Sequence, residues 1–168
     1  MRGRAIRWIL PLLLVSVAGV GVAMAATAST TSKTGTVMTA HSSKFGTILV
    51  ASNGMTLYRY TPDMKNASAC SGACASYWPP LLVKGTAKPT AGSGASASLL
   101  GTTKRSNGTM QVTYAGWPLY FYAGDKKAGQ TSGQGFQKSW YVVSTTGALV
   151  KHAVSTSSGT TTKKSAWG

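Results

Sequence analysis

A seven-residue motif occurs twice in this 168-residue chain, and its two copies lie 62 positions apart. Residues 57–63 read LYRYTPD and residues 119–125 read LYFYAGD. An ungapped alignment at this spacing gives ten identities over residues 46–80, where composition alone gives roughly two or three. The chain therefore contains an internal duplication. Because each copy is small, we expect the two units to pack together around shared apolar faces.

Short β-prone runs separated by turn residues fill both units. We expect strands at residues 37–40, 46–50, 55–60, 99–104, 109–114 and 117–122, and a closing hairpin formed by 140–144 and 148–154. Asn53-Gly54 and Asn107-Gly108 fit type I′ hairpin turns, because both residue types tolerate positive φ. The sequence therefore predicts an all-β fold of two duplicated antiparallel β-meander units, packed as a small sandwich or open barrel with little helix.

Composition also divides the chain into segments. Residues 1–25 have a basic start, an apolar run and Ala23-Met24-Ala25, which is the pattern of a cleaved secretory signal peptide. We expect a flexible leader at 26–36, repeat unit 1 at 37–84, a Gly/Ala/Ser-rich linker at 85–98, repeat unit 2 at 99–154 and a flexible basic tail at 155–168. No Cys lies near the cleavage site, so we expect no lipobox. Residues 26–168 contain no second apolar stretch of spanning length, so we expect no transmembrane anchor after cleavage. The predicted location is extracellular or in the cell envelope.

The charge of the chain is strongly unbalanced, since Asp63 and Asp125 are the only acidic residues against seventeen Lys and Arg. A surface of this sign attracts polyanions, so anionic cell-envelope polymers are the expected partners. Export and the scattered positions of the lysines argue against nucleic acid. Two carboxylates and two histidines leave little to titrate, so we expect stability to change little between neutral and mildly acidic pH.

Three motifs together resemble one bacterial family. They are the repeated Tyr-x-Tyr-x-x-Asp, the segment from Cys70 to Pro80, and residues 111–120, which read QVTYAGWPLY. This combination is similar to the secreted repeat family, also called predicted lipoproteins with a Y-x4-D motif, whose function is unknown. The resemblance covers residues 46–150 and implies no catalytic residues. Many family members carry a lipobox cysteine, which this chain lacks.

The two aspartates have a structural interpretation and two chemical alternatives. Each follows a turn-forming pair, so its carboxylate is expected to end a strand and to accept backbone N–H bonds from the next loop. Asp63 and Asp125 would act as a general acid and base only if the fold placed them about 5 to 9 Å apart across a cleft. Calcium binding is the second alternative, although so few anionic oxygens make a weak site.

Cys70 and Cys74 are the only cysteines and, in an exported protein, are expected to form a disulfide. The main alternative is an extracytoplasmic copper-binding or thiol-redox protein, in which these two residues supply the thiolates. Thioether and imidazole ligands for such a site are available at Met55, Met64, Met110, His41 and His152.

The repeated aromatic residues define each unit and are expected to form core and cross-strand pairs. They are Tyr58, Tyr60 and Trp78 in unit 1, and Tyr120, Tyr122 and Trp140 in unit 2. If these tyrosines are exposed, they are suited to stacking on the sugars of cell-wall polymers. We therefore expect a secreted, non-catalytic structural or binding module without a cofactor, with copper or thiol-redox chemistry and carbohydrate or anionic polymer binding as alternatives.

Overall fold

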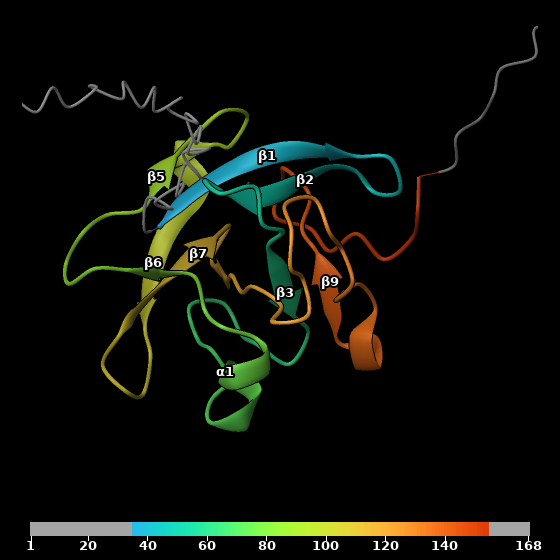
Figure 1. Ribbon diagram of the computed structural model, residues 1–168. Coiled ribbons are helices and arrows are strands. Elements are labelled where there is room, and N and C mark those ends of the chain that lie inside the picture. Colours follow the sequence, from blue (N-terminus) through green and yellow to red (C-terminus); the bar gives the residue numbers. More distant parts are fainter. Residues whose placement is uncertain (1–34, 155–168) are drawn as a thin grey trace, which may run out of the picture.

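The computed structural model describes residues 35–154 (Figure 1). The predicted signal peptide, the tail from residue 155 and most of the predicted leader lie outside this range. The strands are β1 (Thr36–Ser42), β2 (Gly46–Ala51), β3 (Tyr58–Tyr60), β4 (Leu82–Val83), β5 (Thr90–Ala91), β6 (Leu100–Lys104), β7 (Met110–Tyr114), β8 (Trp117–Pro118) and β9 (Trp140–Val142). One α-helix, α1 (Ala73–Tyr77), and two 3-10 helices, η1 (Ala97–Leu99) and η2 (Phe136–Lys138), complete this range.

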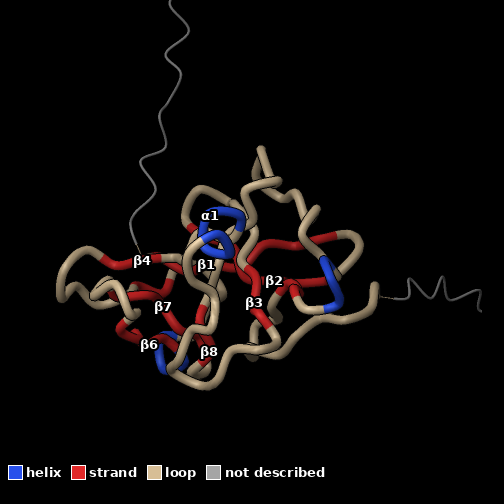
Figure 2. Tube along the Cα trace, turned by 90° about the horizontal axis from the view of Figure 1, so that it is seen from below, coloured by secondary structure: helices blue, strands red, loops and turns tan. Residues whose placement is uncertain are grey.

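The predicted all-β class with two repeated units and little helix is confirmed, and none of the sheets closes into a barrel. Figure 2 shows β4, β6, β7 and β8 together on one side of the molecule, where they form one antiparallel sheet. Several predicted strands are shorter than expected: β3 covers half of residues 55–60, and in the segment 148–154 only Leu149 forms a bridge, with Val143. Within residues 35–154, no helix is long and apolar enough to cross a membrane.

The β1–β2 hairpin of unit 1 and the β6–β7 hairpin of unit 2 occupy equivalent places in the fold. Their equivalent residues, however, are not separated by the 62 positions that separate the two copies of the motif. Leu57 donates its backbone N–H to Leu49 (3.1 Å), and Leu119 donates in the same way to Val112 (3.0 Å). Leu49 rather than Val50 is therefore the counterpart of Val112, so the ungapped alignment is wrong by one residue in these strands. The cause is the following loop, which has three residues (52–54) in unit 1 and two (115–116) in unit 2.

The turn types also differ from the prediction. Ala115 and Gly116 both have positive φ, at 50° and 82°, which is the pattern of a type I′ turn. In the two Asn-Gly pairs only the glycines have positive φ, so the predicted type I′ turns there are wrong. Each asparagine instead accepts a backbone N–H two residues ahead, from Met55 (3.1 Å) and from Thr109 (3.2 Å). This side-chain bond is an Asx turn, which asparagine forms as readily as it adopts positive φ.

The two units are interleaved. Strand β3 of unit 1 pairs with β9 of unit 2, and the two lie side by side in Figure 1. Tyr58 and Tyr120 exchange backbone hydrogen bonds of 2.8 and 3.0 Å. Tyr58 also pairs with Val142, and its counterpart Tyr120 pairs with Pro80, 62 residues before Val142. A pseudo-two-fold axis therefore passes between Tyr58 and Tyr120.

The segment 85–98, expected to be a linker, is partly built into the fold. Strand β5 lies within it and pairs with β1 in parallel, which adds one parallel contact to an otherwise antiparallel arrangement. Helix η1 lies at its end. The turn at residues 84–88 is exposed.

Two apolar clusters form the core, and both units contribute to each. The first contains Val37, Leu49, Ala51, Leu57, Leu81, Val83, Val112, Tyr114, Leu119 and Val143. The second contains Ile48, Val50, Tyr58, Cys70, Trp78, Tyr120, Trp140 and Val142. The repeat positions occur in pairs within a cluster, such as Leu57 with Leu119 and Trp78 with Trp140. Neither unit therefore has a core of its own.

We predict that cutting the chain between the units does not separate them. A protease site placed in the exposed turn at 84–88 should be cleaved, and the two fragments should elute together with an unchanged circular dichroism spectrum. The reason is that β3 and β9, and both apolar clusters, join the units. Fragments that separate without denaturant would contradict the interleaved fold.

Candidate functional site

The first tyrosine of each motif, Tyr58 or Tyr120, donates its hydroxyl hydrogen to the aspartate of the other unit. Tyr58 Oη lies 2.6 Å from Asp125 Oδ2, and Tyr120 Oη lies 2.8 Å from Asp63 Oδ2. Both tyrosines are fully buried and both aspartates are 5 % exposed. Burial raises the pKa of each tyrosine, and the neighbouring carboxylate raises it further. The hydroxyls therefore stay protonated and remain donors.

The second oxygen of each carboxylate fixes a loop of its own unit. Asp63 Oδ1 accepts the backbone N–H of Ala69 at 2.7 Å, and Asp125 Oδ1 accepts that of Ser132 at 2.9 Å. Each aspartate thus joins its own motif segment, the following loop and the tyrosine of the other unit. Asp63 follows β3 as expected, whereas Asp125 does not end a strand, because the segment after β8 (Trp117–Pro118) forms only isolated bridges, at Tyr120. All four oxygens have donors from the protein itself.

A buried arginine supports the Asp63 side. Arg105 donates to Ser68 Oγ (2.9 Å), Gln111 Oε1 (2.5 Å) and the carbonyl oxygen of Cys70 (2.5 Å). Ser68 Oγ is in turn 2.7 Å from the hydroxyl of Tyr120. The guanidinium charge thus lies at the end of a hydrogen-bonded chain that reaches the carboxylate of Asp63 through Tyr120.

Arg59, a second buried arginine, ties unit 1 to the closing turn of unit 2. Its Nη1 donates to the carbonyl oxygen of Gly147 at 2.6 Å, and its guanidinium lies 3.8 Å from the centre of the Trp117 ring. Burial lowers the pKa of Arg59 to about 10, against the opposing effect of the Asp63 charge. The side chain stays charged at neutral pH.

The remaining motif aromatics form a continuous stack across the pseudo-two-fold axis. The rings of Trp78 and Trp140 are parallel, with centroids 3.8 Å apart. Tyr60 stacks on Trp140 at 4.2 Å, and Tyr122 packs on Trp78 at 4.4 Å. The central tryptophans are 3 % and 2 % exposed. This stack is a rigid floor built from both units.

A cavity of about 510 Å³ opens above this floor, between α1 of unit 1 and η2 of unit 2. Two exposed rings stand at its edge, Tyr77 (67 % exposed) and Phe136 (41 % exposed). Gln137, beside Phe136, has a positive φ of 48°, which is a strained conformation for a residue other than glycine. The lining residues are Tyr60, Ala73, Cys74, Tyr77, Trp78, Phe136, Gln137 and Trp140.

The predicted disulfide between Cys70 and Cys74 is confirmed. It encloses the start of α1, and Cys74 lines the cavity. In this oxidised pair neither sulfur is a thiolate, which is the form that binds Cu(I). Among residues 35–154, no group of three or more His, Cys, Asp or Glu residues is placed to hold a metal ion.

The structure brings together all eight residues of the repeat motif around one axis, but it places the cavity edge on residues that the sequence did not indicate. Tyr77 and Phe136 have no identical counterpart in the other unit, and Phe136 is the equivalent of Cys74. Arg105, Ser68 and Gln111 were also missed. A buried network of this kind has no fixed sequence spacing, so only the isolated Gln in the apolar run 110–114 was a signal.

Residues 39–82 and 101–144 both match the model of a protein family described as a secreted repeat of unknown function. The protein belongs to this family. The two matched segments contain one copy each of the crossed tyrosine and aspartate, so the family repeat is the unit that the pseudo-two-fold axis relates. The family description supports an extracellular location. Neither a curated protein nor a solved structure matches the chain.

We predict that the crossed hydrogen bonds couple Tyr58 to Asp125 and not to Asp63. Tyr58→Phe and Asp125→Asn should each lower the free energy of unfolding by about 1.5–3 kcal/mol, because each removes a hydrogen bond to a buried charge. Their effects should be non-additive by about 1 kcal/mol or more in chemical denaturation.

The matched control pairs Tyr58→Phe with Asp63→Asn, which share no hydrogen bond. These two effects should add to within about 0.5 kcal/mol. Coupling within a unit that equals the coupling between units would show that the bonds are not crossed.

We predict a small gain of stability on mild acidification. Burial raises the pKa of Asp63, and the hydrogen bonds from Ala69 and Tyr120 only partly oppose this shift. A raised folded-state pKa means that the folded protein binds a proton before the unfolded chain does, so the free energy of unfolding rises as pH falls toward about 4. The melting temperature should rise slightly between pH 7 and pH 4 in the wild type, and this dependence should be absent from Asp63→Asn. A fall in the wild type that Asp63→Asn abolishes would show that the pKa is lowered.

Proposed function

We propose that the protein is a secreted, non-catalytic binding module that holds a carbohydrate polymer of the cell envelope in its aromatic cavity. The observation that carries this proposal is the pair of exposed rings, Tyr77 and Phe136, above a buried stack of Trp78 and Trp140. The volume of about 510 Å³ lies within the range of small-molecule sites.

The chemistry of the cavity suits a sugar. A pyranose ring has an apolar C–H face, which packs on an aromatic ring, and an edge of hydroxyl groups. The hydroxyl of Tyr77 and the amide of Gln137 make no hydrogen bond with another described residue, so both are available to those hydroxyls. An apolar cavity with a few polar groups at its edge is the usual form of a ligand site.

The proposed module is non-catalytic because its two side-chain carboxylates are buried and hydrogen-bonded within the fold. A general acid or base must reach the substrate with its proton or lone pair. Asp63 and Asp125 are buried, and each is bonded to a tyrosine hydroxyl and a backbone N–H. Both carboxylates therefore stabilise the fold and do not face a substrate site.

We predict that removing either exposed ring weakens binding of uncharged oligosaccharides. With chitin and cellulose oligosaccharides as probes, Tyr77→Ala and Phe136→Ala should each reduce affinity by roughly two- to tenfold, which is the value of one aromatic contact. Titration can follow the change in tryptophan fluorescence, because Trp78 and Trp140 line the cavity.

Met64→Ala is the matched control, because Met64 is 71 % exposed, apolar and outside the cavity lining. It should leave affinity unchanged. Tyr77→Ala and Met64→Ala should keep the wild-type melting temperature, since both side chains are largely exposed. Phe136→Ala should lower it slightly, because the Phe136 ring packs on Trp78 and Tyr122 at 5.7 and 5.9 Å, so its affinity is measured well below its melting temperature. Wild-type protein that binds no oligosaccharide, or a Met64 effect equal to the ring effects, would refute the proposal.

A further inference from the structure

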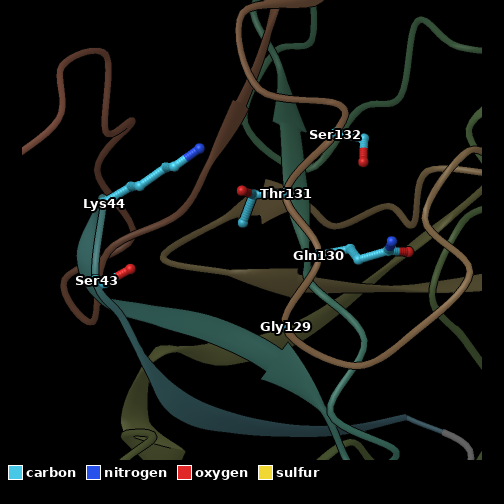
Figure 3. A pocket seen from close by; sticks show the side chains of 6 residues that line it. All are labelled: Ser43, Lys44, Gly129, Gln130, Thr131 and Ser132. Carbon is cyan, nitrogen blue, oxygen red and sulfur yellow. The ribbon is translucent and has the colours of Figure 1, made fainter.

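A second pocket, of about 340 Å³, lies between the turn that joins β1 to β2 and the loop held by Asp125. Its lining residues are Ser43, Lys44, Gly129, Gln130, Thr131 and Ser132. In Figure 3 the Lys44 side chain extends from the turn toward the loop, and Thr131 points back toward the turn. Gln130 points to the other side of the loop.

The groups that face this pocket are hydrogen-bond donors without partners. The side chains of Ser43, Lys44 and Thr131 form no hydrogen bond with another described residue. An ammonium group and two hydroxyls together match the oxygens of a phosphate or carboxylate, which accept several bonds at once. Asp125 is the carboxylate on the same loop, and it is buried and turned toward Tyr58 and the N–H of Ser132.

The pocket is connected to the aromatic cavity by one short stretch of chain. Ser132 lines the pocket and Phe136 lines the cavity, so their Cα atoms are no more than roughly 14 Å apart. Gly133 lies between them and is held against Trp78, because a Cβ atom at this position would meet the indole at 2.7 Å. Its N–H also donates to Tyr58 Oη at 3.3 Å. The stretch therefore holds the two sites at a fixed spacing.

We propose that this pocket is an oxyanion subsite, in which Lys44, Ser43 and Thr131 bind the phosphate or carboxylate groups of an anionic cell-envelope polymer. The inference rests on the proposed function and names its ligand class, a polymer whose sugar rings occupy the cavity while a charged group occupies the pocket. Without the three arginines of the predicted signal peptide, fourteen Lys and Arg remain against two Asp, and this net charge of +12 concentrates such a polymer at the surface. The pocket gives one charged group of the polymer a defined position.

The test compares three probes: poly(glycerol phosphate), polygalacturonate and an uncharged chitin oligosaccharide. Lys44→Gln should weaken binding of an anionic polymer by about tenfold, which is the value of a hydrogen bond to a charged group. Thr131→Val should weaken it by about two- to threefold, without any change of charge. Neither variant should alter binding of the uncharged oligosaccharide.

Lys84→Gln is the matched control, since it removes the same charge at an exposed site near the other end of β1. Gly35 touches Val83 there, and seven strand residues span about 20 Å. Its effect should be less than twofold. Equal effects of Lys44→Gln and Lys84→Gln would overturn the proposal and leave only general charge attraction.

An effect of Lys44→Gln on one anionic polymer alone supports the subsite and identifies its ligand as phosphate or carboxylate. A different observation would show that the cavity does not bind the sugar: Tyr77→Ala would then leave the affinity for the uncharged oligosaccharide unchanged.

Discussion

The crossed hydrogen bonds between Tyr58 and Asp125 and between Tyr120 and Asp63 are the constraint on which the fold depends. A carboxylate buried without donors costs several kcal/mol. Here each unit supplies a backbone N–H to one oxygen of its own aspartate, and the tyrosine hydroxyl that satisfies the second oxygen comes from the other unit. The same bonds fix the register of the pairing between Tyr58 and Tyr120, because a shift of one residue would turn each tyrosine to the opposite face of its extended segment. The only two carboxylates of the chain are therefore used to join the units.

The frame around the pseudo-two-fold axis is symmetric, but the edge of the cavity above it is not. The paired tryptophans are identical in both units, whereas the edge carries Tyr77 and a disulfide on one side and Phe136 with Gln137 on the other. An asymmetric edge presents different groups to the two ends of a ligand. A polysaccharide also has two chemically different ends. A cavity with two different sides can therefore bind it in one direction, which fits the proposed ligand.

Sequence alone predicted the features that depend on short-range pattern. The β-prone runs, the duplication and the Cys70–Cys74 disulfide could each be seen within a few residues or at one fixed spacing. The sequence could not show that each tyrosine bonds to the aspartate of the other unit. A Tyr–Asp bond within one unit and a Tyr–Asp bond between the units involve the same residue types at equivalent positions. The shift between Leu49 and Val50 was hidden by the loop lengths, which differ by one residue and place the identical valines out of register. The cavity was missed because its exposed rings lie outside the repeated pattern.

The two sides of the cavity are held in place by different physical means. On the unit 1 side, the disulfide ties Cys74 to Cys70, whose carbonyl oxygen is bound by Arg105. On the unit 2 side, Gln137 and Lys138 adopt positive φ values of 48° and 54°, each at a cost of about 1–3 kcal/mol. Such strain persists only where the surroundings impose it, and the bond from the N–H of Gly135 to the carbonyl oxygen of Trp140 closes this turn at 2.8 Å. Two unrelated devices that fix opposite edges of one cavity are expected where the geometry of the cavity itself matters. A frame that served only to hold the repeats together would need neither.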